Sequence, residues 1–285
     1  MNTRSSVRIA AAILAAAALA ACESLESAIR KPTVEVAAFQ IERLSFETAD
    51  LRLDLKITNP NPVGIELAGF DYSLVIEGAE LVKGSVDKKV GLRAGGSSVV
   101  PVPMSFRYTE LFAAARSLAD KDETPYQITV GLSFDLPVLG KMKVTAAHKG
   151  TLPVVHVPRV RLASVRLEGV TLQGASLVLG VELANPNGFG LSLASLDYRF
   201  SVSGQRWATG TSRRAAQIAA KQSGRIDIPV NLEFASIGRS VRDTLLGRAP
   251  LAYSLSATLS VGTTLPLLKS ATVPVEVSGQ IGLTR

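Results

Sequence analysis

The residues from 51 to 58 alternate between apolar and polar without interruption. Every odd position is Leu or Ile, and the even positions are Arg, Asp, Lys and Thr. A period of two residues is typical of a β-strand with one buried face. The segment Asn59-Pro60-Asn61-Pro62 then ends the strand, because proline donates no backbone hydrogen bond and restricts the residue before it. A second strand is predicted to begin at Ile65.

Two asparagines shape this corner. Asn59 and Asn61 are placed to hydrogen-bond the nearby backbone. The inward face of the following strand continues through Tyr72, and a shift of one residue near Gly69 predicts a β-bulge. We interpret the motif as a structural strand–corner–strand unit, and a binding role for the asparagines is the alternative.

The corner and its strands occur twice. Asn185-Pro186-Asn187-Gly188 follows another alternating strand and begins 126 positions after the first corner (185 − 59 = 126). At the same offset, Asp71-Tyr72 falls on Asp197-Tyr198, and Gly78 falls on Gly204. This period is longer than that of solenoid repeats, so it predicts two copies of one unit, each large enough to bury its own core. The two predicted domains are residues 32–155 and 158–285.

The remaining pattern predicts further strands and one short helix in each domain. Pro101 and Pro103 mark their strand as an edge strand or a bulged one. Thr109 is placed to cap the helix of the first domain, and Ser236 that of the second. The expected strands are 34–40, 41–46, 98–106, 127–136, 142–147, 254–260 and 272–281, and the expected helices are 110–119 and 236–246.

One strand of the second copy has an unusually apolar second face. Its even positions are Val178, Gly180 and Glu182, where the first copy has Arg, Asp and Lys. We expect the other domain to cover this face, and a bound molecule is the alternative. The domains are joined by Pro153–Pro158, whose prolines favour extended neighbours and limit the relative orientations of the domains.

These residues carry a resemblance to a known family. A strand ending in Asn-Pro-Asn, a short apolar strand, and an Asp-Tyr strand closing at glycine resemble the late-embryogenesis-abundant group 2 (LEA type 2) family, also called water-stress and hypersensitive-response domains. The resemblance covers both copies and implies an all-β fold: two tandem antiparallel sandwiches of seven strands, similar to fibronectin type III, each with one helix. It implies no enzyme activity and no cofactor. Desiccation or stress protection is the usual role, and lipid binding or transfer has been proposed for some relatives. Gly188 departs from the first copy, which has Pro62.

The first residues read as an export signal. Arg4 and Arg8 precede an apolar run that is too short to span a bilayer, and residues 1–21 are therefore predicted to be a signal peptide. Leu19-Ala-Ala-Cys22 resembles a bacterial lipoprotein box, which implies lipidation of Cys22. Cys22 is the single cysteine of the chain, and lipidation gives a lone cysteine in an exported protein a role. The alternatives are an ordinary signal peptide or an uncleaved anchor. Residues 22–31 form a tether.

The same signal predicts where the protein is located in the cell. Glu23, rather than Asp, follows the cysteine, and by the enterobacterial sorting rule this resembles outer-membrane lipoproteins. We therefore expect a location in the bacterial cell envelope, anchored to the outer membrane and facing the periplasm. The net charge of +7 falls to +5 without the two arginines of the leader (7 − 2 = 5). Such a charge is favourable near anionic lipid, and export disfavours nucleic acid as the partner.

Composition limits the remaining possibilities. A chain that is 47% hydrophobic and 19% charged is not a disordered, highly hydrated stress protein. The pairs Lys88-Lys89 and Arg213-Arg214 are expected to be solvated hairpin charges. Trp207 is expected to pack in the core, with a place at a rim or interface as the alternative.

Catalytic chemistry is not apparent in the sequence. His148 and His156 are the two histidines, and no spacing of His, Cys and Asp resembles a zinc site. No nucleophile elbow, phosphate loop or dinucleotide fingerprint occurs. Asp50 and Asp54 are expected to point outward and not to form a paired-carboxylate site.

The sequence therefore predicts a non-catalytic, lipid-anchored envelope protein with tandem LEA type 2 domains, acting in stress or desiccation protection or in envelope interactions. Its expected partners are the membrane, through Cys22, and lipids or envelope proteins. The alternative is a carrier that shields an acyl chain or another hydrophobic ligand between sheet and helix. A hydrolase would require a cleft with clustered titratable groups, and the sequence indicates none. No metal or cofactor is expected.

Overall fold

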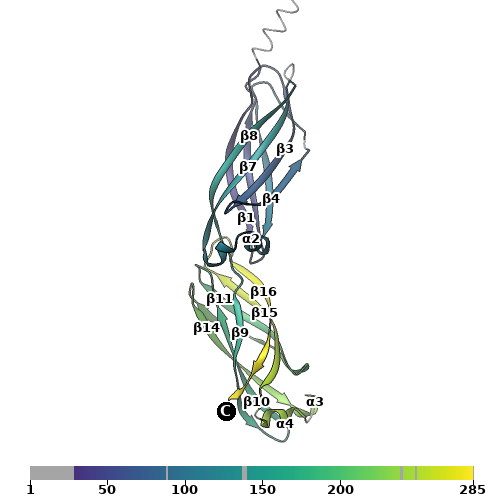
Figure 1. Ribbon diagram of the computed structural model, residues 1–285, viewed down its shortest axis with the longest axis vertical. Coiled ribbons are helices and arrows are strands. Elements are labelled where there is room, and N and C mark those ends of the chain that lie inside the picture. Colours follow the sequence, from purple (N-terminus) through teal and green to yellow (C-terminus); the bar gives the residue numbers. More distant parts are fainter. Residues whose placement is uncertain (1–28, 88, 137–139, 238–239, 248, 285) are drawn as a thin grey trace, which may run out of the picture.

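Two β-sandwich domains lie end to end along the long axis of the molecule (Figure 1). The computed structural model describes residues 29–87, 89–136, 140–237, 240–247 and 249–284. The predicted signal peptide, Cys22 and most of the tether lie outside the described residues. The predicted fold class, two tandem antiparallel sandwiches with short helices, is confirmed. In the described part of the chain, no helix has both the length and the apolar character needed to cross a membrane.

The first domain packs a three-stranded sheet on a five-stranded sheet. The smaller sheet has the order β1-β2-β6 and the larger has the order β4-β3-β7-β8, with the short β5 also pairing with β3. The strands are β1 (Thr33–Leu44), β2 (Thr48–Thr58), β3 (Ile65–Ile76), β4 (Ala79–Val86), β5 (Val90–Leu92), β6 (Ser97–Arg107), β7 (Glu123–Leu136) and β8 (Gly140–Pro153). The core between the sheets is made of the alternating inward residues, such as the fully buried Leu55, Ile57, Leu74 and Phe134.

The second domain repeats this topology strand for strand. Its sheets have the orders β14-β10-β9-β17 and β12-β11-β15-β16, with β13 pairing with β11. The strands are β9 (Arg159–Val170), β10 (Gly174–Ala184), β11 (Leu191–Val202), β12 (Gln205–Ser212), β13 (Ala216–Ile218), β14 (Ser223–Glu233), β15 (Leu251–Thr263), β16 (Ser270–Ile281) and β17 (Leu283–Thr284). The parallel pairing of β17 with β9 has no counterpart in the first domain, and the sequence pattern did not predict it.

The hairpins and bulges repeat as well. Glu77-Gly78 and Ser203-Gly204 have positive φ at both residues (50° and 81°, 49° and 79°), which is the requirement of the tight turns that suit β-hairpins. The bulge predicted near Gly69 is confirmed, because the register between β3 and β7 shifts between Leu67 and Gly69. The same shift recurs in the second domain between β11 and β15.

Both helical segments differ from the prediction. In the first domain α2 (Tyr108–Ala114) is followed by a 3₁₀ helix (Arg116–Asp120), where one helix over 110–119 was expected. The predicted cap at Thr109 is wrong: the helix begins at Tyr108, and no side chain caps it. The second domain has α3 (Phe234–Ile237) and α4 (Ser240–Leu246). The second helical segment begins at Phe234, two residues before the predicted cap at Ser236. Tyr108 and Phe234 are both buried and lie 126 residues apart, so each helical segment begins at a buried aromatic ring.

The edge strands agree with the positions of the prolines. β6 lies at the edge of its sheet, and Pro101 and Pro103 are exposed there.

Trp207 packs in the core, as expected: it is buried, and its ring meets Phe200 edge to face at a centroid distance of 6.2 Å.

On the second face of β10, the expected cover by the other domain is wrong at Gly180. At Gly180 the cover is the Arg225 guanidinium of neighbouring β14, which donates to the Ser164 hydroxyl of β9 at 2.7 Å. An added Cβ at Gly180 would lie 2.4 Å from that hydroxyl oxygen and 2.5 Å from the Arg225 Nη2 atom. Neither the other domain nor a bound molecule is needed to cover this position, because the domain's own side chains cross it.

Candidate functional site

The corner asparagines are among the most deeply buried polar side chains of the described chain. Asn59, Asn61, Asn185 and Asn187 are each 0–2% exposed. An amide transferred out of water without hydrogen-bond partners costs several kcal/mol, roughly 2–7 by reference state. Each of these amides must therefore be paired, and their partners show what the corner does.

The first asparagine of each corner holds the corner itself. The Asn59 Nδ2 atom donates to the carbonyls of Val63 at 2.8 Å and Arg93 at 3.0 Å. Its Oδ1 atom accepts from the backbone N–H of Asn61 at 3.0 Å. In the second copy, Asn185 makes the corresponding bonds to Phe189, Ala219 and Asn187.

The second asparagine holds the chain that enters the domain. The backbone N–H of Arg30 donates to Asn61 Oδ1 at 2.6 Å, and Asn61 Nδ2 donates back to the Arg30 carbonyl at 2.9 Å. In the second domain, His156 N–H donates to Asn187 Oδ1 at 2.7 Å, and Asn187 Nδ2 donates to the His156 carbonyl at 2.8 Å. We call this two-bond contact the entry clamp. It pairs an amide side chain with one residue's backbone as a neighbouring strand would.

The entry clamp of the second domain lies at the domain junction. His156 is 9% exposed, its ring stacks on Phe112 of α2 at a centroid distance of 4.9 Å, and its Nε2 atom is 3.0 Å from the Lys121 carbonyl. The linker before it is also bound to the first domain: Val154 N–H donates to the Asp122 carbonyl at 2.8 Å. The linker from Val154 to His156 is therefore a buried, hydrogen-bonded segment and not an exposed spacer.

A buried tyrosine of the first domain also binds the linker. The Tyr108 hydroxyl donates to the Pro153 carbonyl at 3.0 Å. Tyr108 is 2% exposed, and this burial raises the pKa of its phenol well above its ordinary value. The phenol therefore remains a hydrogen-bond donor over the physiological pH range.

Two departures of the second copy from the first meet at Asp122. Gly188 replaces Pro62, and a Cβ built there would lie 2.7 Å from the Asp122 carboxyl carbon. Lys221 replaces Gly95, and it keeps the left-handed φ of that glycine (58° against 61°). The Lys221 ammonium donates to the Pro186 carbonyl at 2.7 Å and pairs with the Asp122 carboxylate at 2.7 Å.

The ion pair is not a large source of stability. Its side chains are 44% and 46% exposed, and pairs of this kind contribute about 0–1 kcal/mol. The left-handed conformation of a lysine costs about 1–2 kcal/mol. The second domain therefore accepts local strain to place a cation against the first domain, which favours a role in positioning over one in stability.

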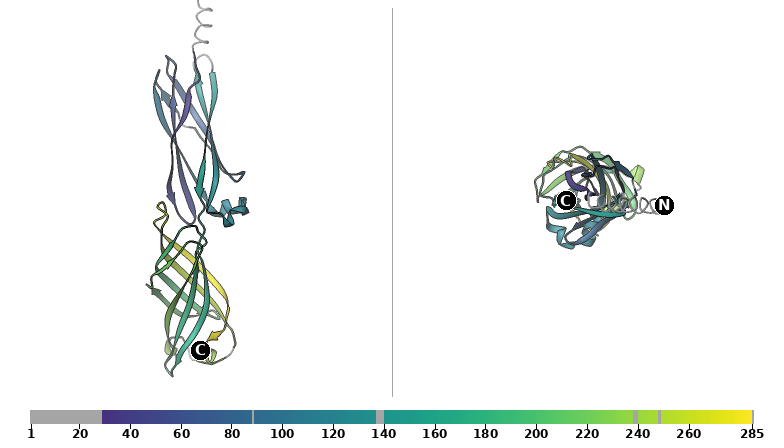
Figure 2. Two further views of the ribbon diagram at one scale, coloured as in Figure 1. Left: turned by 90° about the vertical axis from the view of Figure 1, so that its left-hand side faces the viewer. Right: turned by 90° about the horizontal axis from the view of Figure 1, so that it is seen from above.

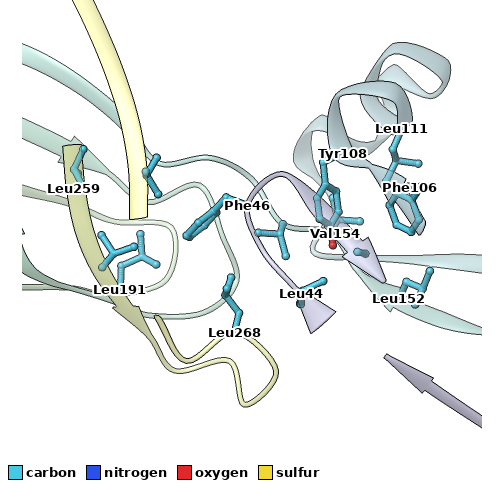
Figure 3. Close-up of a cluster of buried hydrophobic side chains, with 14 of the residues drawn as sticks. Leu44, Phe46, Phe106, Tyr108, Leu111, Leu152, Val154, Leu191, Leu259 and Leu268 are labelled. Carbon is cyan, nitrogen blue, oxygen red and sulfur yellow. The ribbon is translucent and has the colours of Figure 1, made fainter. Parts of the chain in front are cut away.

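Apolar side chains complete the junction. Phe46 extends from the β1–β2 turn toward Leu191 and Leu268 of the second domain, while Leu44 and Val154 lie on its other side (Figure 3). Phe46 is 5% exposed. Beside it lies a groove of about 480 Å³, lined by residues 43–47, by Val157 and Leu268, and by residues 270–274. The two domains therefore share one continuous apolar contact.

The carboxylates singled out in the sequence are each paired with a neighbouring side chain. Asp54 is 8% exposed and receives the Arg52 guanidinium at 2.8 Å, and Asp50 accepts from the Ser105 hydroxyl at 2.6 Å. Near the junction, the Lys121 ammonium lowers the pKa of Glu77 through a hydrogen bond of 2.9 Å. Within the described ranges, no group of three or more His, Cys, Asp or Glu side chains could hold a metal ion.

Other predicted residues are separated. His148 lies on β8 beside Phe39, in the first domain, and does not meet His156. Arg213 and Arg214 are exposed, and Lys89 pairs with Glu66 at 3.0 Å. Lys88 and Cys22 lie outside the described residues. Sequence reasoning missed the contributions of Arg30, His156, Asp122 and Lys221, and the signal available was the departure of the second copy at positions 188 and 221.

Comparison with known proteins gives one family for both domains. The model of the late embryogenesis abundant protein (LEA_2) family matches residues 54–150 and 181–279. Each match covers the strands on either side of one asparagine corner.

Individual relatives match one domain at a time. The desiccation protectant protein Lea14 homolog of Glycine max is 25% identical over 122 residues, which are 43% of this chain and 80% of the relative. The probable desiccation-related protein LEA14 of Arabidopsis thaliana is 25% identical over 126 residues, 44% of this chain and 83% of the relative. A solution structure of an Arabidopsis thaliana protein has 24% identity and a TM-score of 0.36, and the match covers 46% of this chain and 86% of that one.

Removal of an entry clamp should destabilise its domain. Asn61→Ala and Asn187→Ala each remove both hydrogen bonds to the entering chain, at the partly buried backbone of Arg30 and the buried backbone of His156. We expect a loss of about 1–3 kcal/mol in the free energy of unfolding. Urea unfolding measures the change. Asn231→Ala, at an exposed position on β14, is the control and should change stability by less than about 0.5 kcal/mol. Equal effects of all three substitutions would contradict the clamp.

Exchange of the residues at the two left-handed positions should separate strain from positioning. Gly95→Lys should cost about 1–2 kcal/mol, because the strained lysine gains no partner there. Lys221→Gly relieves the strain but removes the pair with Asp122, so we expect little loss of stability and a wider range of domain orientations. Small-angle X-ray scattering measures that range. If Lys221→Gly leaves the scattering curve unchanged, the lysine does not position the domains.

Proposed function

Because this chain belongs to the late embryogenesis abundant protein family, we propose that it is a non-catalytic, lipid-anchored protein of the bacterial envelope that protects against water stress. Its two domains act as one elongated unit. Lipid attachment is proposed at Cys22, from the Leu19-Ala-Ala-Cys22 sequence, with the outer membrane as the site of anchoring and the periplasm as the compartment. The role in stress rests on relatives whose names refer to desiccation.

The junction is the observation that carries the proposal. A bacterial anchor at residue 22 would lie beside the first entry clamp, at Arg30, and the second domain lies at the opposite end of the first (Figures 1 and 2). The contacts of Asp122, His156 and Phe46 fix this end-to-end arrangement. A fixed rod would present the second domain away from the membrane surface, where it would meet envelope components.

The polar groups in the domains support a role without catalysis. Catalytic acids and bases are generally free to reach a substrate within hydrogen-bond distance. Here the buried polar groups are engaged in structure: Asp54 with Arg52, His156 with the Lys121 carbonyl, and the asparagines with backbone. The domains therefore offer surface rather than a reaction centre.

Mass spectrometry and survival measurements together test the anchored stress role. We expect the mature protein to begin at Cys22 and to carry acyl groups, and Cys22→Ser to abolish both. A strain lacking the gene should survive drying or osmotic shock less well, and the wild-type protein should restore survival where Cys22→Ser does not. Ser27→Ala, also in the tether, is the control and should behave as wild type. A free thiol on an unprocessed chain, or unchanged survival, would overturn the proposal.

The junction groove favours a second candidate function, the binding of a hydrophobic ligand. Its walls include the apolar side chains of Leu44, Phe46, Leu268 and Val273, and Val157 is 47% exposed at its side. A volume of about 480 Å³ falls in the range of small-molecule sites, roughly 300–1,000 Å³. This site would lie between the domains and not between sheet and helix, where the sequence placed it.

Native mass spectrometry of the Cys22→Ser protein tests this second function. We expect an acyl-chain ligand to co-purify with the Cys22→Ser protein. Adding Val157→Asp should remove this ligand, because it places a charge on the groove wall. Leu172→Asp, at a residue that is 76% exposed and does not line the groove, should leave the ligand bound. Absence of ligand from all three proteins would exclude the carrier function.

A further inference from the structure

Cations gather at the end of the first domain where the chain enters. The clamp joins Arg30 to the first corner, the Arg93 carbonyl binds the same corner through Asn59, and Lys31 follows Arg30. Lys141 lies at the same end of the domain. In the backbone register of the larger sheet, Asp135 of β7 is opposite Glu66 of β3 on one side and opposite Lys141 of β8 on the other. All four side chains are exposed. We call Arg30, Lys31, Arg93 and Lys141 the basic collar.

The collar cations are not neutralised by neighbours. Among the described residues, none of the four forms an ion pair within 4.0 Å. Lys89 at this end is instead paired with Glu66 at 3.0 Å. Asp87 and Asp135 line one hollow together with Lys141. The collar therefore leaves an excess of positive charge at the entry end.

The repeat shows that the fold does not need these charges. At the offset of 126, the counterparts of Arg30, Lys31 and Arg93 are His156, Val157 and Ala219. Asn59 and Asn185 bind the backbone carbonyls of Arg93 and Ala219 in the same way, so the side chain at that position is free to vary. These three positions therefore carry no Lys or Arg where the entry end faces another domain, and they carry Arg, Lys and Arg where it faces the tether.

We infer that the entry end of the first domain docks on a bilayer surface, with the basic collar contacting the phosphates of anionic phospholipids. This inference rests on the proposed anchor at Cys22. Arg30 is eight residues from Cys22 (30 − 22 = 8), so an extended tether keeps the collar within about 30 Å of the attached lipid. Collar and membrane are therefore forced together at a high effective concentration.

The collar orients the protein rather than holding it. Several acyl chains on one cysteine already give stable attachment. Each Lys or Arg at an anionic surface strengthens binding by roughly fivefold, and salt weakens the effect because the attraction is screened beyond about 8 Å at physiological ionic strength. With the entry end on the lipid, the long axis stands away from the bilayer and the second domain faces the periplasm (Figure 2).

Co-sedimentation with vesicles tests the docking without the anchor. The probe is the chain from residue 22 onward with Cys22→Ser, mixed with phosphatidylcholine vesicles with or without phosphatidylglycerol. We expect binding only to the anionic vesicles, and binding that falls as salt is raised. Replacement of all four collar residues by Gln should reduce the partition coefficient at least tenfold.

The control removes the same charge from the other domain. Arg199, Arg206, Arg213 and Arg214 are exposed there, and their replacement by Gln should leave vesicle binding near the parent value. Binding lost equally in both variants would show a net-charge effect and overturn the docking surface, as would absence of parent binding at low salt. Neither result bears on the acylation of Cys22, which mass spectrometry of the mature protein tests separately.

Discussion

The arrangement of the molecule depends on one buried amide in each domain. The side chains of Asn61 and Asn187 would be costly to bury alone, and each is paired instead with both backbone groups of one residue in the entering chain. In the first domain this residue is Arg30, at the end of the tether. In the second it is His156, in the linker. One contact, duplicated with the domain, therefore fixes where each domain begins.

The second copy has changed around this contact so that it also joins two domains. Gly188 makes room for Asp122, and Lys221 adopts the conformation of a glycine to pair with it. The ring of His156 stacks on the helix of the first domain. At the entry end of the first domain, the positions corresponding to His156 and Val157 carry Arg30 and Lys31 instead. Both copies keep the asparagine contacts that the fold requires. The residues around them differ with what each entry end faces: the first domain in one copy and the tether in the other.

Much of this fold could be predicted from the sequence, and the contacts between domains could not. Alternation over 51–58 and the prolines of the corner are local signals, and the period of 126 is visible by comparing the chain with itself. Together they predicted the strands, the bulge at Gly69 and the tandem sandwiches. The helix starts were wrong because burial of Tyr108 and Phe234 outweighs local capping. The cover over Gly180 was wrong because Arg225 reaches it from a neighbouring strand. The clamp joins residues 31 positions apart, and spacing alone does not indicate it.

The central claim is that the linker and corner fix the two domains as one body. Residual dipolar couplings of backbone amides, measured in both domains of the Cys22→Ser protein, test this most directly. The account predicts that a single alignment tensor fits both domains in the arrangement of Figure 1. Two tensors of different magnitude, one for each domain, would show independent tumbling and contradict it.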